Sequence, residues 1–210
     1  LARRIASATR SLVWLQITSS PARCVSMTSR LPFHIAVFCK APVAGRVKTR
    51  LIPQFGAGGA AAIYLQLALH ALQTVNDARE QYAATASLWV ADDTEHPAIR
   101  QWSRDFNLPV FLQQGEDLGA RMLHCLQSLA ADRQRVLLIG TDCPALTAGD
   151  LASAAATLDA GNRWVFTPAE DGGYVLVGSN APNAVPFSDV AWSTDAVMAQ
   201  TRAALAAANE

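Results

Sequence analysis

Residues 135–144 read RVLLIGTDCP, and this stretch is the strongest single indication of the fold. The run from Arg135 to Gly140 is almost continuously apolar, as expected for a strand that helices cover on both faces of a parallel sheet. Asp142 follows that strand directly, and Pro144 restrains the chain behind it. Ligands of such sheets bind at the carboxyl ends of the strands. The stretch therefore predicts a central strand that ends at a functional carboxylate.

Apolar runs of strand length alternate with longer helical patterns on both sides of this strand. The expected strands are 34–40, 87–91, 109–113, 135–140, 163–167 and 174–178. The expected helices are 60–75, 95–106, 118–131, 147–158 and 194–207, with N-caps at Thr147 (followed by Asp150) and at Ser193 or Thr194. Too few residues separate the last two strands for a helix, so we expect antiparallel neighbours. The pattern predicts a three-layer α/β/α sandwich with a mostly parallel sheet and one late antiparallel strand.

The chain length of 210 residues fits one domain, which we predict over residues 31–210. The sequence is 51% hydrophobic and 16% charged, so it can form a packed core. It contains no run of eighteen apolar residues, and we expect no membrane span. Residues 1–30 are rich in Arg and Ser and contain no acid. We expect a disordered or wrongly annotated leader, with Met27 as the true start or a transit peptide as the alternative.

The formal charge is balanced overall but unevenly distributed. Nine of the 17 Lys and Arg residues precede Asp77, whereas all 17 acidic residues lie from Asp77 onward. This asymmetry is either chance or the mark of a cleft with a phosphate-binding wall and opposing carboxylates. A net charge of zero leaves no broad basic surface, so nucleic acid is not expected as a partner. The four cysteines show no zinc-site spacing, which favours a reducing cytoplasm: Cys24, Cys39, Cys125 and Cys143.

Residues 40–51, KAPVAGRVKTRL, follow the first predicted strand and place four cations around a glycine. Backbone N–H groups of a Gly-containing loop, together with Lys and Arg side chains, are what a phosphate group requires. The segment is not a Walker A loop, because Gly45 does not directly precede the Lys48–Thr49 pair. The ordinary alternative is a solvated basic loop. We predict catalytic roles for Lys48 and Arg50, together with Asp142 at the end of the central strand. We predict substrate binding by Lys40, Gly45, Arg46 and Thr49.

Residues 113–122, QQGEDLGARM, follow the third predicted strand and open a helix. In a functional interpretation, Gln114 and the turn at Gly115 contact a base, while Arg121 faces a phosphate or Asp117. The alternative is structural, because acids near a helix N-terminus are favoured by the helix dipole. Both interpretations stay open from the sequence.

Asp142 and Asp171 are the candidate metal ligands. Asp171 belongs to residues 168–174, PAEDGGY, where the chain departs from parallel order and can return toward Asp142. Two carboxylates from separate strand ends suit Mg²⁺ or Mn²⁺, with phosphate and water as further ligands. Gly172 and Gly173 would allow a ligand to approach the backbone closely. The alternative is that Asp142 caps a helix or a turn.

Five motifs in order together resemble a known bacterial family. They are F-x-K-x-P-x-x-G-x-V-K-T-R-L (38–51), Q-G-x-D-L-G-x-R-M (114–122), G-T-D-C-P (140–144), E-D-G-G-Y-x-L-x-G (170–178) and W-S-T (192–194). The family is that of the nucleotide-diphospho-sugar transferase-like glycosyltransferases of the GT-A superfamily, some of them associated with radical-SAM proteins and arsenosugar biosynthesis. The likeness extends over residues 33–206. More distantly, the chain is similar to 2-phospholactate and molybdenum cofactor guanylyltransferases.

The resemblance implies a GT-A fold, a nucleotide-sugar or nucleoside triphosphate substrate, and a divalent metal. It would give the 48–50 segment to phosphate and Asp142 to the metal, although the motif here is T-D-C-P rather than D-x-D. Glycosyl transfer from a nucleotide-diphospho-sugar is the leading hypothesis. The alternatives are nucleotidyl transfer with release of pyrophosphate, and a non-catalytic nucleotide-binding protein. The sequence leaves the acceptor and the oligomeric state open.

Overall fold

The structure is a computed structural model that describes residues 15–16, 32–130 and 135–210. Its strands form one mixed sheet in the order β1-β6-β7-β5-β2-β3-β4. The strands are β1 (Leu15–Gln16), β2 (Phe33–Cys39), β3 (Ala84–Val90), β4 (Val110–Leu112), β5 (Arg135–Ile139), β6 (Trp164–Pro168) and β7 (Tyr174–Ser179). The helices are α2 (Ile52–Gln81), α3 (Pro97–Phe106), α4 (Leu118–Ala130), α5 (Ala148–Asp159) and α6 (Val197–Ala207), with short 3₁₀ turns η1 (Thr49–Leu51) and η2 (Val185–Phe187).

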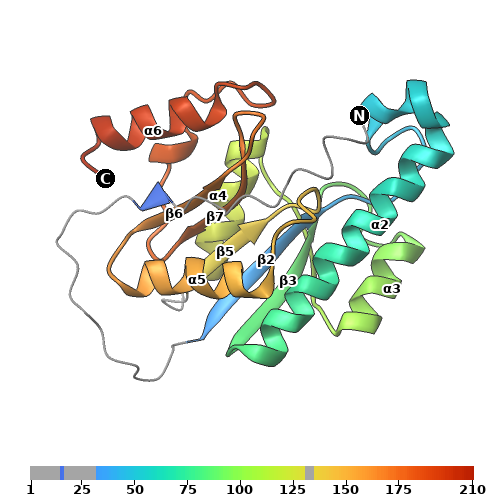
Figure 1. Ribbon diagram of the computed structural model, residues 1–210, viewed down its shortest axis with the longest axis horizontal. Coiled ribbons are helices and arrows are strands. Elements are labelled where there is room, and N and C mark those ends of the chain that lie inside the picture. The colour runs from blue at the N-terminus through green and yellow to red at the C-terminus, as the bar shows by residue number, and fades with distance from the viewer. Residues whose placement is uncertain (1–14, 17–31, 131–134) are drawn as a thin grey trace.

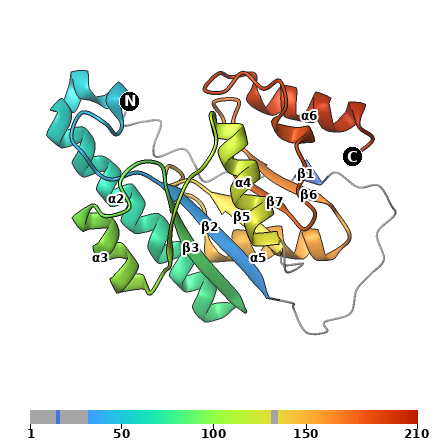
Figure 2. The ribbon, with the colours of Figure 1, turned by 180° about the vertical axis from the view of Figure 1, so that it is seen from behind.

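Helices cover both faces of the sheet, as Figures 1 and 2 show from opposite sides. Side chains of α2, α3 and α5 pack in one apolar core, and side chains of α4 and α6 pack in the other. Neighbouring residues of β2 alternate between these cores: Ile35 and Val37 belong to the first, Ala36 and Phe38 to the second. The predicted α/β/α sandwich is confirmed, and it explains why the inner strands are apolar at nearly every position.

Strands β5, β2, β3 and β4 run parallel, whereas β7 lies antiparallel between β5 and β6. The predicted late antiparallel strand is therefore confirmed. As a result, β6 runs in the direction of β5, and the carboxyl ends of all the parallel strands meet at one edge of the sheet. Every segment that the sequence singled out as chemical follows one of these strand ends.

Two helices, α2 and α6, begin at least three residues away from their predicted starts. Helix α2 starts at Ile52 rather than at residue 60, with a break at Gly56, whose φ of 69° only glycine adopts readily. Helix α6 starts at Val197 rather than at Thr194, and Ser193, with a left-handed φ of 68°, lies in the loop before it. The predicted N-cap at Ser193 or Thr194 is wrong, since the cap residue is Ala196 and has no side-chain bond. The predicted capping box of Thr147 and Asp150 is confirmed.

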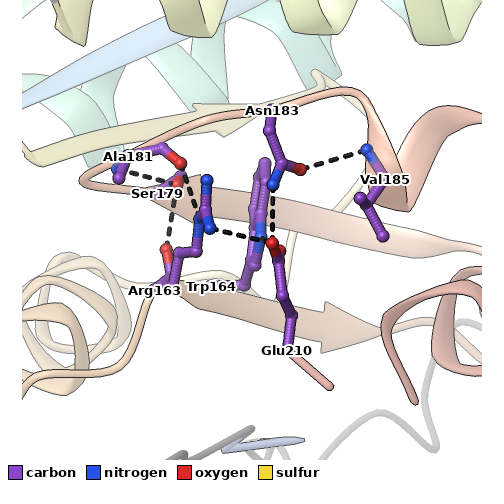
Figure 3. Close-up of polar contacts among 7 residues, drawn as sticks. All are labelled: Arg163, Trp164, Ser179, Ala181, Asn183, Val185 and Glu210. Carbon is purple, nitrogen blue, oxygen red and sulfur yellow. Dashed lines mark hydrogen bonds and ion pairs between the residues drawn. The ribbon is translucent and has the colours of Figure 1, made fainter. Parts of the chain in front are cut away.

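A polar network ties the end of α6 to the sheet (Figure 3). One carboxylate oxygen of Glu210 accepts hydrogen bonds from Arg163 Nη1 at 2.8 Å and Asn183 Nδ2 at 2.7 Å, and the other accepts from Trp164 Nε1 at 3.2 Å. These donors belong to the start of β6 and the segment after β7. The network fixes one end of α6, and the segment before α6 reaches the functional edge.

One helical stretch of the described residues, Thr49–Gln81, is long and apolar enough by composition to cross a membrane. In this fold it lies along the sheet with Tyr64, Ala68 and Leu72 buried in the core, as expected for a helix of a packed layer. The leader predicted over residues 1–30 falls outside the described residues apart from β1, whose backbone pairs antiparallel with β6.

Candidate active site

The cation-rich segment after β2 forms a defined loop that is anchored in the core. Val47 is buried, so it anchors the loop in the core, and Gly45 takes a φ of 84° at the turn before it. Lys40, Arg46 and Arg50 are exposed, and none forms an ion pair with any residue that the structure describes. Three unpaired cations held on one short loop form an attractive surface for an anion. Thr49 opens the η1 turn in the same segment.

Tyr64 anchors the start of this loop, and the sequence analysis did not identify it. Its hydroxyl accepts from the Lys40 N–H at 2.8 Å and donates to the Lys40 carbonyl oxygen at 3.0 Å. Burial, and secondarily the neighbouring Cys39, raises the pKa of Tyr64 well above its ordinary value, so the phenol stays protonated and can donate. No local pattern points to this role, since the partner lies 24 residues earlier in the sequence.

Asp92 is a second residue that the sequence analysis missed. Its Oδ1 accepts from the Ala41 N–H at 3.0 Å, which holds the loop from the β3 side. Burial and the charge of Asp92 raise the pKa of Cys39 to about 12, so this thiol is no nucleophile at neutral pH. Two side chains from separate elements thus fix the backbone of the cation loop where it leaves β2.

Lys48 and Asp142 form the link between the cation loop and the central strand. Lys48 Nζ lies 3.0 Å from Asp142 Oδ1; the Lys48 side chain is 22% exposed and that of Asp142 65% exposed. Thr141, which precedes Asp142, is buried and holds the strand end in the core. The structure therefore brings together the predicted phosphate-binding and metal-binding groups, and it leaves the carboxylate open to solvent.

A cavity of about 500 Å³ opens beside this ion pair. Arg50, Asp142, Asp171 and Gly173 all line it, so the structure brings these predicted site residues to one place. In Figures 1 and 2 the segment before α2 and the segment before α6 lie on opposite sides of the strand ends. The rest of the lining is largely apolar and aromatic, and it comes from β2, β5, β7, α4 and the segment before α6. A second cavity of about 420 Å³, between α3 and β4, contains none of the predicted site residues.

The segment 114–121 plays a structural part at the start of α4. Asp117 Oδ1 accepts from the Ala120 N–H at 2.7 Å, which is an N-cap bond, and Arg121 Nε donates to the Gly115 carbonyl oxygen at 3.0 Å. The Arg121 guanidinium therefore contacts Gly115, whereas Arg121 meets Asp117 only through its backbone N–H, which donates to the Asp117 carbonyl oxygen at 3.1 Å. Gln114 is exposed and forms no hydrogen bond with the described residues. Base binding by Gln114 and Gly115, and phosphate binding by Arg121, stay predictions.

Gly172 is needed for packing. It has a φ of 86°, and a β-carbon there would overlap the carbonyl oxygen of Asp195. Its own carbonyl oxygen accepts from the Met198 N–H at 2.8 Å. The neighbouring Asp171 is exposed, and its Oδ1 accepts from the Gly173 N–H at 3.1 Å. The loop after β6 is thereby joined to the start of α6, and it presents Asp171 and Gly173 to the cavity.

The donor chemistry of the cavity fits a hard divalent cation. Asp142 and Asp171 supply carboxylate oxygens to one cavity, and Mg²⁺ is typically held by one or two carboxylates together with substrate phosphates. Within residues 15–16, 32–130 and 135–210, no group of three or more His, Cys, Asp or Glu side chains is placed to hold a metal. A metal here would therefore take its remaining ligands from substrate and water.

The sheet topology, with the candidate site at the carboxyl ends of the parallel strands, is that of the nucleotide-diphospho-sugar transferase fold. Residues 74–194 match the profile of the family described as "Uncharacterized protein conserved in bacteria (DUF2064)", and the chain belongs to that family.

A solved structure of a candidate nucleotide-diphospho-sugar transferase from Desulfovibrio desulfuricans G20 is similar to the chain, with 27% identity and a TM-score of 0.73 over 83% of this chain and 75% of that one. A cytidylyltransferase from Leptospira borgpetersenii serovar Hardjo-bovis (strain JB197) is 11% identical, with a TM-score of 0.46 over 71% of this chain and 60% of that one. The 4-diphosphocytidyl-2C-methyl-D-erythritol synthase from Anaerococcus prevotii DSM 20548 is 15% identical, with a TM-score of 0.43 over 70% of each chain. The last two TM-scores are too low to carry information on function. No curated protein matches the sequence.

Proposed function

We propose that the chain is a transferase that takes a glycosyl group from a nucleotide-diphospho-sugar and passes it to a hydroxyl acceptor. The observation that carries this proposal is the contact of Lys48 with Asp142, which lines a cavity together with Arg50, a cation of the same loop as Lys48 that has no ion-pair partner among the described residues. A diphosphate needs such an array of fixed positive charge. The likeness to the Desulfovibrio protein, described as a candidate nucleotide-diphospho-sugar transferase, supports the same reaction class.

In this reaction the bond between the anomeric carbon and the diphosphate oxygen breaks, and the leaving nucleoside diphosphate keeps the electron pair. The acceptor oxygen bonds to the anomeric carbon, and its proton passes to a carboxylate of the cavity. Negative charge therefore grows on the diphosphate. Lys48 and Arg50 would stabilise that charge, and preorganised charge of this kind is usually the largest contribution to catalysis.

We further propose that Asp142 and Asp171 hold Mg²⁺ or Mn²⁺. When bound, the metal would neutralise part of the diphosphate charge. Asp142 would then exchange its ion pair with Lys48 for the metal, which frees the Lys48 ammonium for a phosphate oxygen. Free thiols at Cys39, Cys125 and Cys143 are compatible with a reducing cytoplasm as the place of the reaction.

Thermal unfolding in the presence of nucleotides and nucleotide-sugars, with and without Mn²⁺, tests the binding part of the proposal. A ligand that binds the folded state raises the melting temperature by mass action. We expect a nucleotide-sugar to raise it further with Mn²⁺, and Asp142→Ala to lose the metal-dependent part. Asp105→Ala is the matched control, because Asp105 is an exposed acid of α3 that does not line the cavity. Retention of the metal effect in Asp142→Ala would remove Asp142 from the metal site.

The products identify the reaction. Release of nucleoside diphosphate from a sugar nucleotide supports glycosyl transfer. Release of pyrophosphate from a nucleoside triphosphate in the presence of a phosphorylated acceptor would replace the proposal by nucleotidyl transfer. Tight nucleotide binding without turnover under any metal would make the chain a nucleotide-binding protein. Arg50→Gln should weaken binding of the diphosphate, whereas the exposed Arg202→Gln on α6 should leave it unchanged.

A further inference from the structure

The cavity beside Asp142 combines two kinds of lining. Arg50 reaches it from the cation loop, whereas side chains of one apolar cluster form a wall, among them Phe38, Met122, Tyr174 and Trp192. Cavities that bind small molecules are lined mainly by apolar and aromatic groups, with a few polar groups that fix orientation. If the diphosphate binds at Arg50, this wall is left for another part of the reaction complex.

Trp192 is held rigidly in this wall. A β-carbon at Gly119 would lie 2.5 Å from Cζ2 of Trp192, so the indole rests directly on the backbone of the first turn of α4. On another side the ring lies 6.5 Å, centroid to centroid, from Phe187. Trp192 is only half-buried and lines the cavity. A fixed, partly exposed indole offers a flat apolar surface to a ligand.

The segments that form this wall are already joined to each other in the ligand-free protein. The Met198 N–H to Gly172 carbonyl bond and the close packing of Gly172 on Asp195 join the loop after β6 to the start of α6. The Glu210 network fixes the other end of α6 (Figure 3). Because Asn183 donates to Glu210 in that network, the Trp192 segment lies between an anchor at Asn183 and the anchors at Asp195 and Met198. The pocket therefore needs no large rearrangement to form.

The charges of the lining oppose a negatively charged occupant. Asp142, Asp171 and Asp195 line the cavity, and Arg50 is the one cation among its described lining residues. The diphosphate of the donor would occupy Arg50, and a metal would engage two of the carboxylates. What remains for a second ligand is an apolar wall and the carboxylate of Asp195. An anionic ligand beside this carboxylate would bind more weakly, because like charges repel.

We infer that this cavity binds the acceptor, and that the acceptor is an uncharged hydroxyl compound with an apolar face that packs on Trp192, rather than a phosphorylated or carboxylated molecule. The inference rests on the proposed function, which supplies the donor at Arg50. It adds the chemical class of the acceptor and makes Trp192 a determinant of acceptor specificity.

Two uncharged and two anionic probes test the inference: phenyl and octyl β-D-glucopyranoside, against phenyl phosphate and glucose 6-phosphate. Calorimetry gives their affinities in the presence of Mn²⁺ with UDP or GDP, and quenching of tryptophan fluorescence reports contact with Trp192. We expect the uncharged probes to quench the wild type and to bind Trp192→Ala about tenfold more weakly. We expect the anionic probes to bind the wild type at least about tenfold more weakly than the uncharged ones.

Asp195→Asn should reduce the discrimination against the anionic probes. Phe111→Leu is the aromatic control, because Phe111 is exposed on β4 and does not line the cavity. Melting of the ligand-free variants separates loss of binding from loss of folding, and Trp192→Phe, which keeps an aromatic ring, should retain most of the affinity.

Anionic probes that bind as tightly as uncharged ones, or uncharged probes that neither quench nor depend on Trp192, would overturn the inference. Such a result together with metal-dependent nucleotide-sugar binding would leave the proposed function intact. Absence of nucleotide-sugar binding would instead remove the proposed function, whatever the probes do.

Discussion

Lys48 Nζ and Asp142 Oδ1 lie 3.0 Å apart, and this contact joins the loop after β2 to the end of β5. The two residues are 94 positions apart in the sequence, yet they occupy neighbouring strand ends because β2 and β5 pair directly. The Lys48 ammonium is paired with the Asp142 carboxylate, which is the group that a metal would bind. If Asp142 binds a metal as we propose, the metal would compete with Lys48 for this carboxylate until an anionic ligand attracted Lys48 away.

We expect Lys48→Met to bind Mn²⁺ more tightly than the wild type in the absence of nucleotide, by about tenfold, because a competing positive charge is removed. The same variant should catalyse glycosyl transfer about 10²-fold to 10³-fold more slowly, since a charge that would stabilise the leaving diphosphate is lost. Calorimetry with Mn²⁺ and a nucleoside diphosphate release assay measure the two effects. Lys40→Met, an exposed cation of the same loop without an ion pair, should leave the ligand-free Mn²⁺ affinity unchanged.

Tyr64→Phe removes both hydrogen bonds to the Lys40 backbone and keeps the ring in the core. We expect a loss of about 1–3 kcal/mol in the free energy of unfolding, because buried backbone groups lose their partner. We also expect a higher KM for the donor with a smaller change in kcat, as the loop is held less firmly before binding. Faster amide exchange over residues 40–50 would show that the effect passes through the loop. Unchanged exchange there would contradict the anchoring role.

Gly172→Ala should destabilise the protein by at least about 2 kcal/mol, since alanine at a φ of 86° is strained and its methyl group would overlap the Asp195 backbone. Gly149→Ala is the matched control. Gly149 lies in the first turn of α5, where a β-carbon would meet only Thr147 Oγ1 at 3.7 Å, so alanine should be neutral or stabilising by roughly 0.5 kcal/mol. Urea unfolding of both variants shows whether the loss of stability is specific to the packing of Gly172 or follows any replacement of glycine by alanine.

His34 makes stability depend on pH. It is buried in β2, with Nδ1 2.8 Å from Thr85 Oγ1 and Nε2 2.8 Å from Ser87 Oγ, and burial lowers its pKa from 6.5 to about 4. Between these two values the unfolded chain takes up a proton that the folded protein does not, so stability is complete above pH 6.5 and falls as the pH approaches 4. The shift corresponds to roughly 3 kcal/mol.

Urea midpoints measured from pH 7 to pH 4.5 should therefore decline less steeply in His34→Gln than in the wild type. Equal slopes in the two proteins would show that other groups cause the decline.

The sequence was most informative where one periodicity dominated. The apolar run that became β5 and the Asp that follows it were both recognisable, because a strand covered on two faces leaves a continuous hydrophobic signal. The late antiparallel pair could also be predicted from the sequence, since a short connection excludes a crossover helix.

What the sequence could not supply are contacts between distant segments. Tyr64 looked like any core residue of a helix, and Asp92 like any loop acid, because their partners are set by the packing of α2 and by the pairing of β3 with β2. The true start of α6 was missed for a related reason. The left-handed Ser193 belongs to a loop shaped by Trp192 and Gly172, and no local pattern encodes that.

The position of β7 also bears on how the chain is synthesised. β5 lies in the interior of the finished sheet, but one of its two edges is covered only by β7, which ends at Ser179. A nascent chain that has reached α5 therefore exposes an apolar strand with unpaired N–H and C=O groups, which is the feature that promotes association between chains. Ribosome pausing between residues 140 and 179 would prolong that exposure, so the yield of soluble protein should be most sensitive to translation speed in this interval.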